Sequence, residues 1–238
     1  MVITLLEGRS DIKCMSFTRW GGVSPAPYDK LNVSFHVGDE DSRVTENRMI
    51  ITRALGADFL ISSRQTHGKE ITEVKRGMKK EAQGFDALMT EKAGHALMIQ
   101  HADCQAVVIH DPVNRAVANV HCGWMGSVSG ILPKTVREME KRYGSRPQDL
   151  FAAIGPSIGP CCYEFKGWKR LLPKNFHPFV SSDHLDLKKV SLCQLKNSGL
   201  ILKNIEINPT CTSCSRDFFS YRREGITGRC ATVVMLNR

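Results

Sequence analysis

The sequence lacks any apolar stretch approaching the ~20 residues that a membrane-spanning helix needs. Its first residues, MVITLLEGRSDIK, also lack the cationic start and the small-residue cleavage site of a secretory signal peptide. The nine cysteines are an odd number in a long chain, which does not suit a framework of paired disulfides. We therefore expect a soluble cytoplasmic protein with reduced thiols, in which cysteine is free for metal binding or nucleophilic chemistry.

Repeats, low-complexity tracts and Gly/Ser-rich linkers are also absent from the 238 residues. The longest breaker-rich stretch, residues 21–28, is typical of an ordered loop. A chain of this length buries roughly 70–75% of its unfolded surface, so its core needs no covalent cross-links. We expect one domain over residues 1–238, present as a monomer or a weak homodimer.

Acidic residues are fewer than basic ones, and 24 Asp and Glu against 33 Lys and Arg give a formal net charge of +9. The densest basic runs, at residues 75–80 and 188–189, contain no aromatic residues. Surfaces that bind nucleic acid interleave the two kinds of residue, so we expect no nucleic-acid partner. The charge indicates either a solvated basic surface or attraction for a small anion such as phosphate.

Hydrophobic periodicity alternates between helix and strand along the chain. It predicts helices at 41–55 with an Asp41-Ser42 cap, at 131–143 with a stop at Gly144, and at 190–198 with a stop at Gly199. Strands are expected at 13–17, 59–63, 96–100, 105–110, 116–120, 150–154, 201–207 and 232–236. No Gly-rich phosphate turn follows the first strand, so a simple doubly wound fold is disfavoured. The pattern favours a mixed-sheet α/β layered sandwich.

The segment 101–121 predicts an antiparallel hairpin, because Asp111 and Pro112 suit the first two positions of a type I turn. A turn centred after Pro112 places Cys104 opposite His121 on one face of the sheet. That arrangement suits two ligands of one metal, a thiolate–imidazole pair, or simply a small buried Cys beside a core His.

Cys104 and His121 both lie at predicted strand ends, next to loops that contain glycine or polar residues. Functional sites usually form at such strand ends. Gly123 and Gly126 permit the backbone to approach a ligand closely. His67, in a polar turn just past a strand, is a third candidate, although spacing alone does not join it to the hairpin. A set of N, S and N ligands leaves the fourth zinc position to water, as in catalytic sites.

Several short motifs occur in a characteristic order along nearly the whole chain. They are FTR at 17–19, GGVS at 21–24, LN at 31–32, HVGD at 36–39, ENR at 46–48, QTHG at 65–68, FDAL at 85–88, ADC at 102–104, HxGWxG at 121–126, IGPSIGPCCYE at 154–164, DL at 186–187 and FSYRR at 219–223. In this order the motifs resemble the YfiH-like family, also called laccase-domain or multicopper polyphenol oxidase proteins.

The resemblance implies a mixed α/β layered sandwich related to the cysteine hydrolase domain of a deamidating bacterial toxin. It implies His67, Cys104 and His121 as the metal ligands, in agreement with the hairpin, and Zn²⁺ as the metal, with Cu²⁺ as the alternative. The implied activity is phosphorolysis of adenosine, inosine and methylthioadenosine to base and ribose 1-phosphate, with adenosine deamination alongside. Copper-dependent polyphenol oxidation is a competing activity.

One motif departs from the family pattern, HAGWRG. This chain has Cys122 where Ala is usual and Met125 where Arg is usual. A guanidinium at that point could hold phosphate or a purine in a bidentate grip, so its loss puts phosphate binding in question unless another arginine replaces it. The candidates for that replacement are Arg19, Arg64, Arg222 and Arg223.

Catalysis is assigned to Cys104, His121 and Asp103. Asp103 is the acid/base candidate because it adjoins Cys104, although strand alternation points it to the opposite face. Asn32 or His36 is the expected donor to the purine or ribose. The expected partners are purine nucleosides and phosphate, and the candidate substrate-binding residues are Arg19, Asn32, His36, Arg64, Gln65, Cys161 and Arg222.

Other functions remain open from the residues alone. Multicopper oxidases use paired HxH motifs, which this sequence lacks, but two His and one Cys suit a copper ion. A metal-free Cys–His amidohydrolase and a non-catalytic binding protein are further alternatives. The CxxC motif at 211–214 needs a second pair to hold structural zinc, and Cys161-Cys162 is a poor one because neighbouring residues on a strand point to opposite faces. We expect ordinary thiols there, with a redox role as the alternative.

Overall fold

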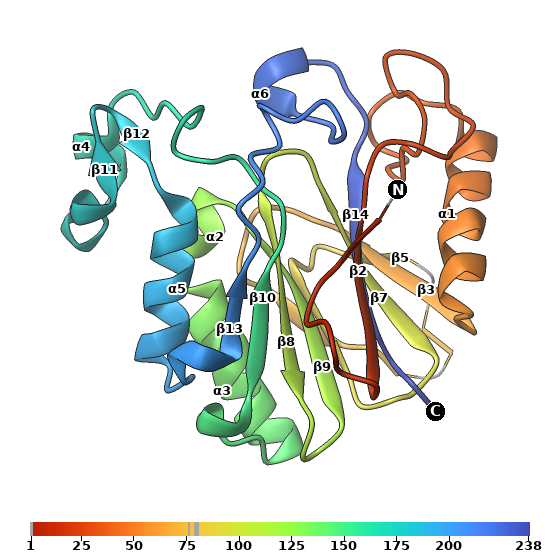
Figure 1. Ribbon diagram of the computed structural model, residues 1–238, viewed down its shortest axis with the longest axis horizontal. Coiled ribbons are helices and arrows are strands. Elements are labelled where there is room, and N and C mark those ends of the chain that lie inside the picture. Colours follow the sequence, from red (N-terminus) through yellow and green to blue (C-terminus); the bar gives the residue numbers. More distant parts are fainter. Residues whose placement is uncertain (1, 76, 79–80) are drawn as a thin grey trace.

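The structure is a computed structural model that describes residues 2–75, 77–78 and 81–238. It contains two six-stranded sheets, with helices on their outer faces (Figure 1). The first sheet has the order β1 (Val2–Thr4), β2 (Ile12–Phe17), β14 (Cys230–Leu236), β7 (His95–His101), β3 (Phe59–Arg64) and β5 (Glu81–Gln83). The second has the order β13 (Ile205–Ile207), β10 (Phe151–Ile154), β8 (Gln105–Asp111), β9 (Ala116–Cys122), β6 (Ala87–Thr90) and β4 (Ile71–Glu73).

The remaining elements are short or lie outside the sheets. The helices are α1 (Asp41–Leu55), α2 (Trp124–Val128), α3 (Ile131–Tyr143), α4 (Trp168–Leu171), α5 (Leu187–Asn197) and α6 (Tyr221–Glu224). Three 3₁₀ turns cover Pro147–Asp149, Lys174–Phe179 and Leu202–Asn204, and a two-stranded hairpin pairs β11 (Val180–Ser181) with β12 (His184–Leu185). Both large sheets mix parallel and antiparallel pairs, so the predicted mixed-sheet α/β architecture is confirmed.

Alternation along β9 separates two apolar layers. Val117 packs between the sheets with Leu97 and Val234 of the first sheet, whereas Val120 packs under α3 and α5. A third cluster joins the outer face of the first sheet to α1. The layers therefore run α1, first sheet, second sheet, α3 with α5, and His121 shares the inward face with Val117.

Element ends differ from the prediction where local hydrogen bonds decide them. Helix α1 is preceded by Glu40, so Asp41 is its first residue rather than its cap. Helix α5 begins earlier than predicted because the Asp186 carboxylate accepts a hydrogen bond from the Lys189 amide. Residues 202–204 form a 3₁₀ turn, so the expected strand 201–207 shortens to β13.

The β8–β9 hairpin has a different register from the one predicted. The loop has four residues, 112–115, because Arg115 adopts φ +52° and the Asp111 carboxylate accepts hydrogen bonds from the Val113 and Asn114 amides. Ala106, not Cys104, therefore pairs with His121. The observed pairing is shifted by two residues from the predicted one, and an even shift leaves the same side chains of β8 and β9 on the inward face of the sheet.

The structure bears on two expectations drawn from composition. Within the described ranges, no helix is long and apolar enough to cross a membrane. Of the basic run at 75–80, residues 76, 79 and 80 lie outside the described residues.

Asn119 provides a test of the sheet packing. Its buried side-chain amide, on β9, donates to the carbonyls of Leu97 and Thr232 in the opposite sheet, at 2.9 Å each. We expect Asn119→Ala to lower the free energy of unfolding by about 2–3 kcal/mol, because both carbonyls lose a donor in a buried layer. Denaturant unfolding measures this, with Asn237→Ala, an exposed amide that bonds Ser10, as the control. Equal midpoints for the two variants would contradict the cross-sheet role.

Candidate functional site

Three side chains from separate segments of the chain meet at one end of the sheets. His67 lies in the turn after β3, Cys104 lies between β7 and β8, and His121 is near the end of β9. Their ligand atoms all lie within 4.8 Å of one another. The His67 and His121 rings meet edge to face, with centroids 4.8 Å apart. The residue that spacing did not connect to the hairpin is therefore its neighbour in space.

Asp86 forms hydrogen bonds to both histidine-bearing segments of this cluster. Its fully buried carboxylate accepts a hydrogen bond of 2.8 Å from His121 Nδ1. The same carboxylate accepts backbone N–H bonds from Thr66, His67 and Gly68, which hold His67 in a left-handed conformation at φ +60°. Because Nδ1 of His121 is occupied, its Nε2 is the nitrogen available to a metal or to the Cys104 thiolate.

Charge is separated within the cluster. Burial alone would lower the pKa of His121, but Cys104 and Asp86 together raise it to about 9. Burial would likewise raise the pKa of Cys104, but His121 and His67 lower it to about 6. Burial would also raise the pKa of Asp86, whereas hydrogen bonds from His121, Gly68 and Thr66 lower it to about 2. In metal-free protein at neutral pH, these shifts favour a Cys104 thiolate beside a His121 imidazolium.

Gly123, two residues after His121, leaves room for the sulfur of Cys104. A Cβ atom at Gly123 would lie 3.0 Å from Cys104 Sγ and 3.6 Å from His67 Cδ2. Cys122 points away from the cluster, into the layer under α3, where its Sγ lies 3.1 Å from Ser127 Oγ. Met125 is exposed and does not line the pocket described below. The chain's departure from the family motif therefore lies beside the site and not in it.

The donor set fits zinc. One thiolate and two imidazole nitrogens are ligands that zinc prefers, and three protein ligands are the number found in open, catalytic zinc sites. The Asp86–His121 bond is the outer-shell contact that usually accompanies a zinc-bound histidine. The same ligands are acceptable to copper, so the donor set suits a metal ion without fixing which metal.

A cavity of about 430 Å³ opens over the cluster. Most of the side chains around it are polar or cationic, and the only carboxylate among them belongs to Asp103. Its lining residues are Ser34, His36, Val37, Ser63, Arg64, Gln65, His67, Gln100, His101, Ala102, Asp103, Cys104, His121, Ile158, Tyr163, Tyr221, Arg222 and Arg229. Four of the predicted substrate-binding residues are in this lining, namely His36, Arg64, Gln65 and Arg222.

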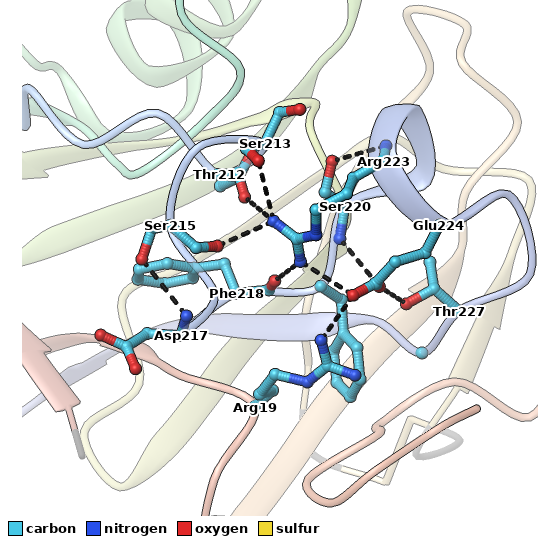
Figure 2. A network of polar contacts seen from close by, with 12 residues as sticks. Arg19, Thr212, Ser213, Ser215, Asp217, Phe218, Ser220, Arg223, Glu224 and Thr227 are labelled. Atoms are coloured by element: carbon cyan, nitrogen blue, oxygen red, sulfur yellow. Dashed lines mark hydrogen bonds and ion pairs between the residues drawn. The ribbon is translucent and has the colours of Figure 1, made fainter. Parts of the chain in front are cut away.

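The other three predicted substrate-binding residues lie outside the cavity lining. Arg19 is buried in ion pairs with Asp29 and Glu224, so its guanidinium is engaged elsewhere. Figure 2 shows the pair with Glu224. Asn32 is fully buried, and its amide braces the loop by bonding Ser34 and Asp39. Cys161 belongs to a separate cysteine cluster.

Arg223 was a further candidate for the missing guanidinium, and it too is occupied. Its side chain donates to the carbonyls of Thr212, Ser213, Ser215 and Phe218 and pairs with Glu224 (Figure 2). Of the four arginines proposed to replace the usual one at position 125, Arg64 and Arg222 reach the cavity.

Asp103 lines the cavity, but its carboxylate is already satisfied. It accepts hydrogen bonds from the hydroxyls of Thr212 and Ser220 and from the Arg222 amide. The strand β8 begins only at Gln105, and Asp103 has φ +90°, so strand alternation does not apply to it. The geometry favours Asp103 as a residue that positions the loops around Cys104 over a residue that moves protons.

Sequence reasoning gave no role in the site to Asp86, Arg229 or Tyr221, which all shape it. Asp86 lay within a quoted motif, yet a carboxylate in a turn gives no sign that it bonds a histidine 35 positions away. Tyr163, Tyr221 and Arg229 line the cavity from the second half of the chain, with Tyr221 at the start of α6 and the other two in loops. The motifs IGPSIGPCCYE and FSYRR signalled the two tyrosines, whereas no pattern pointed to Arg229.

The Asp86 contact can be tested by substitution. We expect Asp86→Asn to weaken zinc binding about 10- to 100-fold, because the amide no longer stabilises His121 and the His67 turn together. Competition with a chromophoric chelator measures the affinity. Asp111→Asn, another buried carboxylate that caps the far end of the hairpin, is the matched control. Equal zinc affinity in both variants would show that Asp86 has no such role.

The Cys104 thiolate predicts a pH dependence in metal-free protein. Alkylation by iodoacetamide should be half-maximal near pH 6, since the reactive thiolate is lost only as pH falls through that value. Mass spectrometry of the peptide that contains Cys104 separates this thiol from the other eight. A midpoint near the ordinary value of about 8.5 would contradict the ion pair with His121.

Residues 13–237 match a family model described as "Multi-copper polyphenol oxidoreductase laccase". A purine nucleoside phosphorylase of Streptomyces coelicolor is 34% identical over 228 residues, which cover 92% of this chain and 93% of that protein. The purine nucleoside phosphorylase YlmD of Geobacillus stearothermophilus is 32% identical over 234 residues, which cover 89% of this chain and 85% of that protein.

Solved structures show the same similarity. The Bacillus licheniformis hypothetical protein YfiH superposes with a TM-score of 0.92 at 31% identity, covering 99% of this chain and 96% of that one. YlmD from Geobacillus stearothermophilus superposes with a TM-score of 0.89 at 29% identity over 100% of both chains. The family match, the relatives and the superpositions agree with the motif resemblance, and the chain belongs to the YfiH-like, laccase-domain family.

Proposed function

We propose that the protein is a purine nucleoside phosphorylase that uses the cavity over the His67–Cys104–His121 cluster. The observation that carries the proposal is a cationic cavity built directly on a zinc-type ligand set. Relatives that match about nine-tenths of the chain are named purine nucleoside phosphorylase. The proposed substrates are adenosine, inosine and methylthioadenosine.

The cavity offers cationic groups for phosphate. Arg64, Arg222 and Arg229 line it, and guanidinium groups bind phosphate oxygens in pairs. Arg222 also donates to the Glu164 carbonyl, and Arg229 donates to the carbonyls of Thr227 and Gly228, so both arginines are anchored. These three residues supply the cationic charge for phosphate that Met125, which lies outside the cavity, does not provide.

Aromatic groups line the same cavity and suit a purine. Tyr163 stands against the Arg222 guanidinium, whose Cζ lies 5.7 Å from the ring centroid, and Tyr221 begins α6 beside it. Burial raises the pKa of the Tyr163 phenol, which keeps the hydroxyl protonated as a donor. The cavity volume of about 430 Å³ lies within the range of roughly 300–1,000 Å³ typical of ligand pockets.

In phosphorolysis a phosphate oxygen bonds to C1′ of the ribose while the bond from C1′ to the purine nitrogen breaks. The arginines orient the phosphate, and the tyrosines hold the departing base, which accepts the electron pair and then a proton. Zinc held by His67, Cys104 and His121 would supply Lewis-acid chemistry at the floor of the cavity. We propose adenosine deamination as a second activity of the same site.

Product analysis tests the proposal. Zinc-loaded protein is incubated with adenosine, with and without phosphate, and the products are identified by chromatography and mass spectrometry. We expect adenine and ribose 1-phosphate only when phosphate is present. Inosine formed regardless of phosphate would establish the deaminase branch. No product from adenosine, inosine or methylthioadenosine would overturn the proposed function.

Arginine variants sharpen this assay. Arg222→Ala should raise the KM for phosphate about tenfold or more, because an anchored charge-assisted contact is worth roughly 1.5–3 kcal/mol. Arg216→Ala, an exposed arginine outside the cavity, is the control. An unchanged KM for phosphate in Arg222→Ala would place the phosphate elsewhere.

A metal-free cysteine hydrolase is the second candidate, as the resemblance to the toxin domain also suggested. The favouring observation is the order Cys104, His121, Asp86, in which a thiolate, an imidazole and a carboxylate form one hydrogen-bonded line. Activity that survives complete zinc removal but is abolished by alkylating Cys104 would favour this candidate. A thiolate-to-copper absorption band accompanied by phenol oxidation would favour the oxidase instead.

A further inference from the structure

Four cysteines that the proposed function does not use lie together on the surface. The Sγ atoms of Cys161, Cys162, Cys211 and Cys214 are all within 4.8 Å of one another. Cys214 Sγ lies 3.6 Å from Cys161 Sγ and 3.4 Å from Cys162 Sγ, and all four residues are free thiols. Zinc–sulfur bonds of about 2.3 Å separate neighbouring sulfurs of a tetrahedral site by about 3.8 Å. The sulfurs thus stand close to the spacing of a tetrathiolate metal site.

The sequence argument against Cys161-Cys162 as a second ligand pair is wrong. It assumed a strand, in which neighbouring side chains face opposite ways. Residues 160–162 instead form a turn, in which the amides of Cys162 and Tyr163 both donate to the Gly159 carbonyl. In this turn both sulfurs reach Cys214.

The CxxC loop is held in place by contacts outside the cysteines. The Arg223 guanidinium donates to the carbonyls of Thr212, Ser213 and Ser215, which surround Cys214 in the chain (Figure 2). The Ser215 amide donates to the Cys211 carbonyl. The loop therefore keeps its shape through its own backbone contacts, as a preorganised ligand site requires.

Two further groups favour negative charge on the sulfurs. The Gly159 amide donates to Cys211 Sγ at 3.1 Å, the kind of outer contact that supports a metal-bound thiolate. The buried Lys188 ammonium donates to the carbonyls of Asn208 and Thr210, immediately before Cys211. Four thiolates exceed the charge of a divalent cation, and this ammonium offsets part of the excess.

We propose that Cys161, Cys162, Cys211 and Cys214 form a second, structural zinc site. Four protein sulfurs close the coordination sphere, which leaves no position for water or substrate and distinguishes this site from the open His67–Cys104–His121 cluster. The site would clamp the turn 159–163 to the loop 211–215, which an isolated bridge between Ser157 and Cys211 already brings together.

The clamp bears on the cavity wall. Ile158 and Tyr163 flank the Cys161-Cys162 turn, and Tyr221 and Arg222 follow the CxxC loop. Thr212, inside the CxxC, bonds Asp103 next to Cys104. Metal at the four-cysteine site therefore holds together the two loops that supply these side chains.

Cobalt substitution of a Cys104→Ala protein tests the site directly. This variant has no thiolate in the first cluster, so any thiolate-to-cobalt charge-transfer band must arise elsewhere. We expect the full-length, reduced variant to bind about one cobalt ion per chain tightly, with the visible bands of a tetrahedral site, and zinc to displace it. The readout is independent of nucleoside turnover, so it stands or falls separately from the proposed function.

A second set of variants locates the ligands. Zinc content measured by mass spectrometry should fall from about two ions per chain to about one in a Cys211→Ser/Cys214→Ser protein, and should stay unchanged in Cys193→Ser. Cys193 is a partly exposed free thiol outside both clusters and serves as the matched control. If the double variant does not fold, the cobalt spectrum of the Cys104→Ala protein still decides the question.

Two results would overturn the proposal. One is a folded, fully reduced Cys104→Ala protein that shows no thiolate-to-cobalt band and binds no zinc. The other is a cluster that excludes zinc because its thiols pair as disulfides in freshly purified protein, detected as a deficit of free thiols after denaturation without reductant.

Discussion

The Asp86 carboxylate is the contact on which the candidate site depends. It lies beneath two segments that are far apart in the chain, the turn carrying His67 and the end of β9 carrying His121. By accepting backbone amides on one side and an imidazole N–H on the other, it sets the position of one ring and the tautomer of the other. A neutral side chain there would leave the amides of a tight turn and a buried histidine competing for one acceptor.

The two-sheet architecture explains why the cluster lies where it does. The layer between the sheets is apolar along Val117 and Val234, becomes polar at Asn119, and ends at His121. The inward-facing side chains of β9 thus change from apolar core residues to polar and ligand-type residues as the strand approaches the loops. Loops of the second half of the chain cover this end, and Arg19 and Arg223 hold them by pairing with Glu224. Burial would raise the pKa of Glu224, but hydrogen bonds from Thr227, Arg223 and Arg19 lower it to about 2.

The sequence predicted the long elements well because their periodicity is strong. The helix 131–143 has the predicted bounds, and strands β8 and β9 contain the predicted ranges. Elements of three or four residues, such as β4 and α6, are too short to show a period. The predicted register of the β8–β9 hairpin was wrong because local hydrogen bonds, and not composition, set the conformation of Arg115 and the capping by Asp111.

The residues of the candidate site could be predicted only in part, because their contacts join segments that are far apart in the sequence. Strand parity predicted Cys104 and His121 on one face, and the structure brings the two together although Cys104 lies just before β8 and pairs with no residue of β9. His67 was joined to them only through family resemblance. Arg19 and Asn32 look like ligand-binding residues in a motif, yet their partners, Glu224 and Asp39, are known only once the chain has folded. Cys161 and Cys162 misled for a similar reason, because a turn and a strand are hard to distinguish in a Gly-Pro-Cys-Cys segment.

The place of β14 has a consequence for biosynthesis. This strand comes last in the chain, yet it lies inside the first sheet, with β2 from the beginning of the chain on one side and β7 on the other (Figure 1). While the ribosome still holds residues 230–236, β2 and β7 lack the neighbour that joins them. His67, Cys104 and His121 are synthesised long before that moment, so the nascent chain carries these three side chains without the finished sheet that brings them together.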